Sequence, residues 1–171
     1  AIEYCGFAYH HEEILTETRK IPAYYYHQFK LNECIKQDIR LITIFEDEWI
    51  FKRDIVKDRL KQIFRKFDGE RIHARKCEIK EIDATIKNQF LDSFHIQGAD
   101  SSIIKLGAFY NNELVSLMTF SHGNISKGSS NKEKVWELNR FCSNPKYHIP
   151  GISSRLLETF KRNFEWDIIF S

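Results

Sequence analysis

Hydrophobic residues along this chain alternate between short runs that favour strands and spaced patterns that favour helices. Residues 39–45 (IRLITIF) leave almost no polar face, which is typical of a strand buried on both sides in an α/β sheet. Residues 1–4 also have the pattern of a strand interior. Between them, residues 24–37 are predicted to form a helix because their apolar side chains fall on one face. The alternation of strands and helices indicates a small α/β unit.

Acidic residues directly after the buried strand predict the start of another helix. Asp47 is a suitable N-cap, and the carboxylate of Glu48 is favourable in a first helical turn. Apolar residues then recur at helical spacing as far as Phe67. Asp68-Gly69 is expected to end this helix, so we place a domain boundary there and assign residues 1–68 to a first domain.

The second predicted domain, residues 69–171, contains strands, two helices and clear turn signals. Strands are predicted over residues 71–79, 103–110, 114–120, 135–141 and 166–170. Asn111-Asn112 joins two of them and tolerates the positive φ of a tight hairpin. One helix is expected around residues 86–94, and the other is expected to begin with Ser153 or Ser154 as its cap.

The composition of the 171 residues is that of an ordinary globular protein. No apolar run approaches the ~20 residues that a membrane-spanning helix needs. The four cysteines are scattered and include no CxxC pair, which favours neither a zinc ribbon nor a disulfide framework. We therefore expect a cytoplasmic protein. The chain begins as a strand interior without an initiator Met, which predicts a fragment of a longer protein.

Positive charge is concentrated in the middle of the chain. Residues 1–51 contain 5 Lys and Arg against 9 Asp and Glu, whereas residues 52–87 contain 12 against 7. This pattern has two interpretations, a solvated helix face or a surface that contacts the phosphates of DNA. The candidate DNA-binding residues, called the basic cluster below, are Lys52, Arg53, Lys57 and Arg59.

The first domain resembles a known nuclease family. The run AIEYCGFAYH, a helix that bears lysine and cysteine, and the run IRLITIFEDEW occur in the order and spacing of the very short patch repair endonucleases. They are closer still to the related phage homing endonucleases, over about residues 1–65. The resemblance implies a partial PD-(D/E)XK nuclease core that cuts double-stranded DNA with Mg²⁺, in the cytoplasm of the host cell if the protein is encoded by a phage.

The same resemblance assigns catalytic residues and shows departures from the family pattern. Glu3 matches the acidic residue that is catalytic and binds the metal, and His10 matches the catalytic histidine after the turn at Gly6. The principal aspartate of the family would precede the start of this chain, and Cys5 stands where a lysine is usual. Because Mg²⁺ prefers hard oxygen ligands, we expect the chain to cut DNA poorly or not at all. A DNA-binding module without catalysis is the alternative.

The second domain resembles the GNAT-type N-acetyltransferases over about residues 70–171. The similar segments are the hairpin LGAFYNNELVSLMTF, the strand ELNRF, and a glycine loop followed by a helix. In that family the loop and the helix N-terminus hold the pyrophosphate of acetyl-CoA. Gly151 and Ser153 are the matching candidates for cofactor binding, but Pro150 removes a backbone donor. We therefore expect this loop to be collapsed or its binding point to be filled by a side chain, and a CoA-dependent acyltransferase is a third hypothesis.

Overall fold

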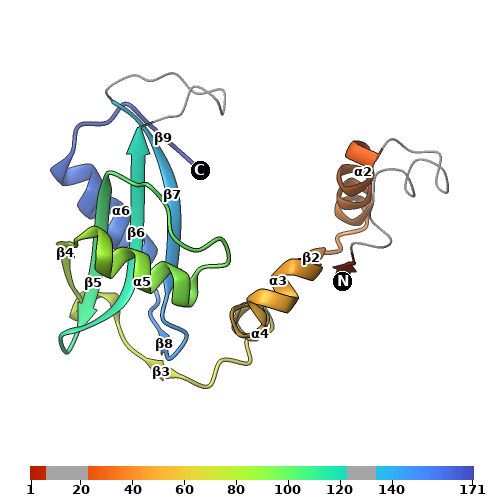
Figure 1. Cartoon of the computed structure of the whole chain (residues 1–171), viewed down its shortest axis with the longest axis horizontal. Coiled ribbons are helices and arrows are strands. Elements are labelled where there is room, and N and C mark those ends of the chain that lie inside the picture. The colour runs from red at the N-terminus through yellow and green to blue at the C-terminus, as the bar shows by residue number, and fades with distance from the viewer. Residues whose placement is uncertain (7–22, 123–133) are drawn as a thin grey trace. The chain divides into compact units, whose positions relative to one another are not determined.

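The structure is a computed structural model that describes residues 1–6, 23–122 and 134–171. These residues form a mixed α/β fold, as the sequence predicted, with two compact units, Ala1–Lys57 and Asp58–Ser171. Figure 1 shows their helices and strands. The identities assigned to the two domains, residues 1–68 and 69–171, stay predictions.

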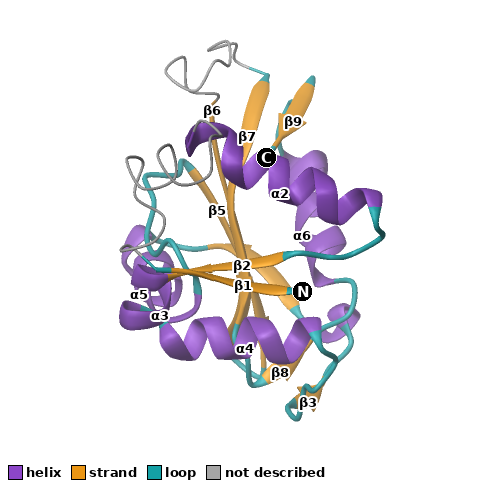
Figure 2. Cartoon of the chain, turned by 90° about the vertical axis from the view of Figure 1, so that its right-hand side faces the viewer, coloured by secondary structure: helices purple, strands orange, loops and turns teal. Residues whose placement is uncertain are grey.

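The first unit is built around two parallel strands. Its elements are β1 (Ile2–Cys5), α2 (Ala23–Lys36), β2 (Ile42–Phe45), α3 (Glu46–Phe51) and the start of α4 (Arg53–Ile63). Strands β1 and β2 pair in register, with Ile2 opposite Ile42 and Cys5 opposite Phe45. Figure 2 shows the two strands side by side. Parallel pairing requires a crossover connection, and α2 lies within that connection.

Strand β2 is buried on one face only, so the prediction of a strand buried on both faces was wrong for the described residues. Ile42 and Ile44 are buried, Thr43 is half-buried, and Phe45 is 45% exposed. This alternation follows from the pleat, which turns successive side chains to opposite faces of a strand. Hydrophobic composition alone does not distinguish a one-sided strand from a two-sided one.

The single helix predicted from Glu48 to Phe67 is two helices, α3 and α4, with Lys52 between them. Asp47 is not the N-cap, because α3 begins at Glu46 directly after β2. Glu48 does lie in the first turn, where its carboxylate accepts a hydrogen bond from the backbone N–H of Phe45 at 3.2 Å. No Gly or Pro marks the break at Lys52, and nothing in the described contacts explains it.

The second unit contains a mixed five-stranded sheet in the order β4-β5-β6-β7-β9. All neighbours pair antiparallel except β7 and β9, which pair parallel. The strands are β4 (Glu78–Glu81), β5 (Ile104–Tyr110), β6 (Glu113–His122), β7 (Val135–Ser143) and β9 (Ile168–Phe170). The predicted β5–β6 hairpin is confirmed, since φ is 49° at Asn111 and 65° at Asn112.

Helices α5 (Ala84–Phe94) and α6 (Ile152–Asn163) cover opposite faces of this sheet, as Figure 1 shows. On the α6 side, the rings of Phe120 and Phe160 stack with centroids 3.8 Å apart. On the α5 side, Leu117 packs in a second cluster with Phe90 and Leu91. Residues of β6 therefore serve both cores, as the alternation of a strand requires.

Two predictions in the second unit were wrong in detail. The strand predicted over residues 71–79 is a short β3 (Glu70–Arg71), a 3-10 turn and then β4. The chain changes sheets at this turn, because β3 pairs in parallel with β8 (Tyr147–His148), whereas β4 joins the five-stranded sheet. Helix α6 is capped by neither Ser153 nor Ser154. Gly151 is its N-cap, with φ 83°, a conformation that favours glycine.

A buried ion pair links α5 to the sheet. The ammonium of Lys87 lies 2.8 Å from Oδ1 of Asp100, and the side chains are only 2% and 6% exposed. Thr119 donates a hydrogen bond to the other carboxylate oxygen at 2.8 Å, and Ser102 donates one to Oδ1 at 3.0 Å. Burial alone would raise the pKa of Asp100, but the hydrogen bonds from Lys87, Thr119 and Ser102 outweigh it and lower that pKa.

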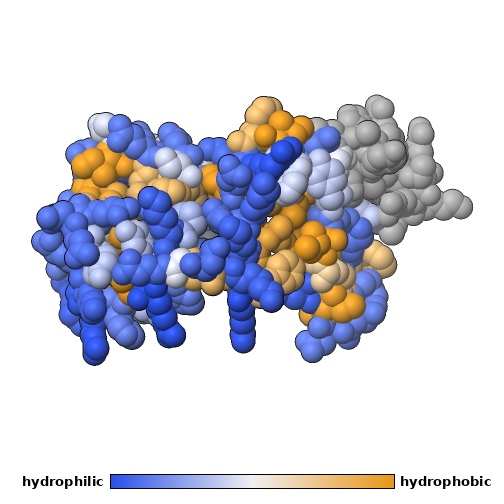
Figure 3. All heavy atoms as spheres, turned by 90° about the horizontal axis from the view of Figure 1, so that it is seen from below, coloured by the Kyte–Doolittle hydropathy of each residue, from blue (hydrophilic) through white to orange (hydrophobic). Residues whose placement is uncertain are grey.

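Large hydrophobic side chains are exposed mainly in the first unit. Figure 3 shows hydrophobic patches among hydrophilic surface residues. In the first unit the exposed ones are Ile2, Tyr4, Tyr25, Phe29, Leu31, Ile35, Ile39, Phe45, Ile50 and Phe51. Among the described residues, no helix has both the length and the apolar character to cross a membrane.

Candidate functional site

An ion pair between β1 and α2 defines the first candidate site, called the β1–α2 site below. The ammonium of Lys30 on α2 contacts Oε1 of Glu3 on β1. The Glu3 side chain is 11% exposed and that of Lys30 is 33% exposed. Lys30 also lies over the buried ring of Tyr26, 5.0 Å from its centroid. The structure thus places a lysine beside Glu3, the residue that the nuclease resemblance predicts to be catalytic and metal-binding.

The sequence did not indicate Lys30 as the partner of Glu3, because the nuclease resemblance places the lysine on the same strand as the acidic residue. The family resemblance implies a lysine two residues after the acidic residue, and Cys5 occupies that position. The lysine comes instead from α2, 27 residues along the chain. His27 lies on the same face of that helix, because residues three apart are neighbours on a helix surface. The His27–Lys30 spacing was the signal that could have identified this face.

His27 and Cys5 complete the site. One ligand atom from each of Glu3, Cys5 and His27 lies within 4.8 Å of the other two. Glu3 and Cys5 share a face of β1 because they are two residues apart in a strand. The His27 ring meets the ring of Phe45 edge to face, with centroids 6.1 Å apart.

The charges in this site shift two pKa values. Burial would lower the pKa of Lys30, but hydrogen bonding and charge interactions with Glu3 and Tyr26 together outweigh burial and raise that pKa, so the ammonium stays charged. The pKa of the Cys5 thiol is raised, first by burial and then by the carboxylate of Glu3. Cys5 is therefore a neutral thiol at physiological pH when no cation is bound.

The described donors do not by themselves fit Mg²⁺. This ion takes hard oxygen ligands, whereas the site offers one carboxylate, one thiol and one imidazole. His10, the second predicted catalytic residue, lies outside the described residues. Glu12 and Glu13 also lie outside them. The expectation of Mg²⁺ at Glu3 therefore stays a prediction.

The predicted DNA-binding residues of the basic cluster lie on more than one face around the α3–α4 junction. Arg53 and Lys57 are exposed and one helical turn apart on α4. Lys57 lies 3.8 Å from the exposed carboxylate of Asp54, and the guanidinium of Arg53 lies over the ring of Trp49. Lys52 precedes α4, and Arg59 lies on a different face of the helix from Arg53. Exposed pairs of this kind are weak enough to be exchanged for phosphate contacts.

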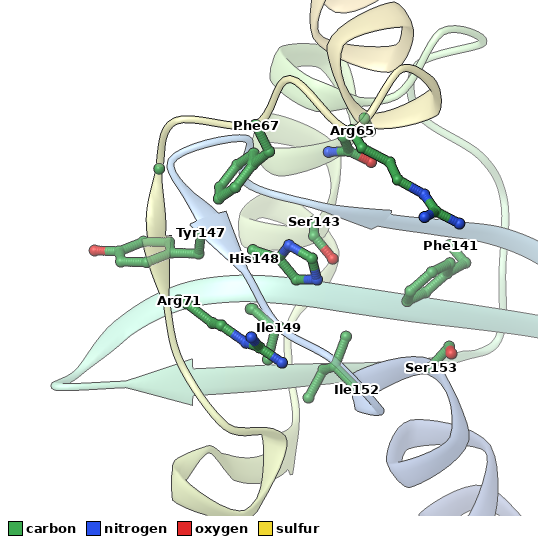
Figure 4. Close-up of a pocket in the computed structure, with 12 residues that line it drawn as sticks. Arg65, Phe67, Arg71, Phe141, Ser143, Tyr147, His148, Ile149, Ile152 and Ser153 are labelled. Atoms are coloured by element: carbon green, nitrogen blue, oxygen red, sulfur yellow. The ribbon is translucent and has the colours of Figure 1, made fainter.

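The second unit contains a cavity of about 720 Å³ at the start of α6, called the α6 pocket below. Figure 4 shows the guanidinium of Arg71 and the imidazole of His148 pointing into it, with Arg65 on the other side. Its described lining is Gln62, Arg65, Phe67, Gly69, Arg71, Phe141, Ser143, Tyr147, His148, Ile149, Ile152 and Ser153. Ser153, predicted from sequence to bind a cofactor, is therefore in the lining of the pocket. The backbone N–H of Ile152 donates to the carbonyl of Ile149 at 3.2 Å, and the expected collapse of this loop stays a prediction.

Two close contacts hold the walls of the α6 pocket in place. The ring of Phe67 meets that of His148 edge to face at 5.4 Å. Gly69 approaches the backbone so closely that an added Cβ would lie 2.4 Å from the carbonyl oxygen of Lys146. Gly151, the other predicted cofactor-binding residue, caps α6 beside the pocket without lining it.

Arg65 has a strained backbone, with φ 55°. A bulky side chain rarely adopts this left-handed conformation, which a glycine adopts without cost. The residue follows the end of α4, where a left-handed residue is a common helix terminator.

Comparisons with known proteins identify no family for this chain. No protein-family model matches it, and no curated protein matches it.

Proposed function

We propose that this chain is a DNA endonuclease of the homing type, with a phosphodiester-cleaving centre at the β1–α2 site. The observation that carries the proposal is the contact between Lys30 and Glu3. It supplies, from a helix, the lysine that the nuclease resemblance requires beside its acidic residue. The parallel β1–β2 pair with its crossover helix supports the same assignment, a partial PD-(D/E)XK core.

The three side chains have complementary roles in this proposal. Hydrolysis of a phosphodiester needs a group that accepts a proton from water and a positive charge beside the developing negative charge. His27 is the proton acceptor, and the ammonium of Lys30 stabilises the charge on the phosphorus oxygens. Glu3 holds Lys30 in position. The basic cluster contacts the phosphates of double-stranded DNA.

A plasmid-nicking assay tests this function. Supercoiled plasmid detects slow cleavage, because one nick per molecule changes its mobility. Lys30→Ala and His27→Ala are each expected to lower the nicking rate by about 10²–10⁴-fold, the usual contribution of a positioned acid, base or charge. Lys36→Ala is the matched control, since Lys36 lies on the same helix in an exposed pair with Glu33. Equal rates for Lys30→Ala and the unaltered chain would refute the proposal. DNA binding without nicking would favour the non-catalytic alternative.

The α6 pocket favours a second candidate function, binding of acetyl-CoA by a GNAT-like domain. The cavity lies beside the N-terminus of α6, a position that attracts phosphate groups. Arg71 and His148 in the pocket lining add side chains that can bind phosphate. The order of α5, the β5–β6 hairpin, β7, the Gly151 loop and α6 agrees with that resemblance.

Calorimetric titration with acetyl-CoA tests this second function. Heat of binding that disappears in Arg71→Ala and persists in the control Arg75→Ala would support it. Arg75 is exposed in the neighbouring 3-10 turn and does not line the pocket. Absence of heat with the unaltered chain would remove the second candidate.

A further inference from the structure

We propose that Glu3, Cys5 and His27 form a binding site for a borderline-soft divalent ion, with Zn²⁺ as the preferred metal. The three side chains come from two elements, β1 and α2, and offer one oxygen, one sulfur and one nitrogen donor. Thiolate and imidazole ligands select zinc, whereas magnesium takes oxygen ligands. The proposal describes a metal-bound state of the β1–α2 site, in which His27 is a ligand and not the proton acceptor of the proposed cleavage, so it does not depend on cleavage of DNA by this chain.

The spacing of the donors suits a single ion after a small movement. Zinc bonds of about 2.0–2.3 Å in a tetrahedron place neighbouring ligand atoms about 3.3–3.7 Å apart. The observed donors lie within 4.8 Å of one another, so the closure needed is at most about 1.5 Å. Rotation of side chains can supply that movement, because His27 and Glu3 each have freedom about two or more bonds. Three protein ligands leave one tetrahedral position for water or a phosphate oxygen.

Glu3 has an oxygen that can take a cation. Its Oε1 contacts the ammonium of Lys30, whereas Oε2 is buried and finds no hydrogen-bond partner among the described residues. A buried carboxylate oxygen without a partner costs free energy, which a bound cation removes. Glu3 can therefore keep Lys30 on one oxygen and coordinate a metal with the other.

Burial of the ligands explains why this site differs from an ordinary surface cluster. Cys5 is 3% exposed and the Glu3 side chain 11% exposed, so a bound ion would be shielded from water. The thiol must lose its proton when zinc binds. The nearby ammonium of Lys30 helps to compensate the negative charge of the thiolate and carboxylate.

Cobalt substitution tests the site directly, because Co²⁺ replaces Zn²⁺ in such sites and its absorption spectrum reports the ligands. The full chain is expected to bind one equivalent of Co²⁺ with a thiolate-to-cobalt charge-transfer band, and Zn²⁺ is expected to displace it where a large excess of Mg²⁺ does not. Cys5→Ser should abolish the band. Cys34→Ser is the matched control, because this half-buried cysteine lies on α2 outside the cluster.

Two further variants complete the test. His27→Gln is expected to lower the affinity for Zn²⁺ by at least about 100-fold. His27 would bind the metal directly, and losing a residue that only supports a ligand already costs about 10–100-fold. Lys30→Met should preserve Zn²⁺ binding, because the three ligand side chains remain in place. The proposed function requires the same variant to stop nicking. Failure of the unaltered chain to bind Co²⁺, or a band that survives Cys5→Ser, would overturn the metal site. Either result leaves the nicking experiment to be judged separately.

Discussion

Removal of the Lys87 ammonium by Lys87→Met is expected to destabilise the second unit severely. The Lys87 side chain is 2% exposed and that of Asp100 6% exposed, so the substitution leaves a buried carboxylate beside the hydroxyls of Thr119 and Ser102 without its ammonium partner. Breaking a buried pair in this way typically costs about 3–5 kcal/mol. For a unit of this size, about 4 °C per kcal/mol gives a fall in Tm of about 12–20 °C.

Thermal unfolding followed by circular dichroism measures this effect. Lys76→Met is the control, because Lys76 is exposed in the 3-10 turn, and it should change Tm little. Folding lowers the pKa of Asp100, so the ionised carboxylate stabilises the folded state. This stabilisation is fully present above the pKa of Asp100 in the unfolded chain, ~3.9, and is lost as the pH falls through the lower pKa of the folded state. The difference between Lys87→Met and the unaltered chain should therefore shrink in acid. A loss below about 1 kcal/mol at neutral pH would refute this reasoning.

Three other substitutions test separate parts of the structure. Replacing the whole basic cluster with glutamine should weaken DNA binding at every sequence alike. The slope of log binding constant against log salt concentration should become smaller by about one unit for each phosphate that is no longer neutralised. An unchanged slope would assign the cluster to a solvated face. Arg65→Gly should raise the free energy of unfolding by up to about 1 kcal/mol, because glycine adopts the left-handed backbone conformation of this position without a steric cost. Denaturant titration measures this change, and a decrease would mean that the guanidinium stabilises the fold. Gly69→Ala should lower the free energy of unfolding by about 1–3 kcal/mol, because the added Cβ would clash with the backbone carbonyl of Lys146. A neutral effect would mean that the backbone moves to accommodate the methyl group.

Local patterns in the sequence predicted much of the fold. The double asparagine at 111–112 identified its hairpin because few residues tolerate positive φ at both central turn positions. Helix α2 and strands β5, β6 and β7 followed from hydrophobic spacing. Residues 71–79 did not follow, because the change of sheet there depends on the distant partner strand β8. The cap of α6 was misplaced because a left-handed glycine ends the loop where a serine would otherwise cap the helix.

The candidate site was predictable only in part. Glu3 was predicted through the resemblance to a nuclease family, but its neighbours Lys30 and His27 belong to a helix whose orientation depends on packing. The sequence shows which residues share a helix face, but not which strand that face covers. The α6 pocket was also hidden, since its lining comes from several separate segments of the second unit.

A double-mutant cycle on Glu3 and Lys30 tests the central claim most directly. Nicking rates are measured for the unaltered chain, Glu3→Gln, Lys30→Met and the double variant, with circular dichroism to confirm folding. If the two residues act as one unit in phosphodiester cleavage, each single variant should lose activity and the double variant should be no slower than the slower single one. Reductions that multiply in the double variant would show independent roles, and unchanged nicking in both single variants would contradict a catalytic centre at the β1–α2 site.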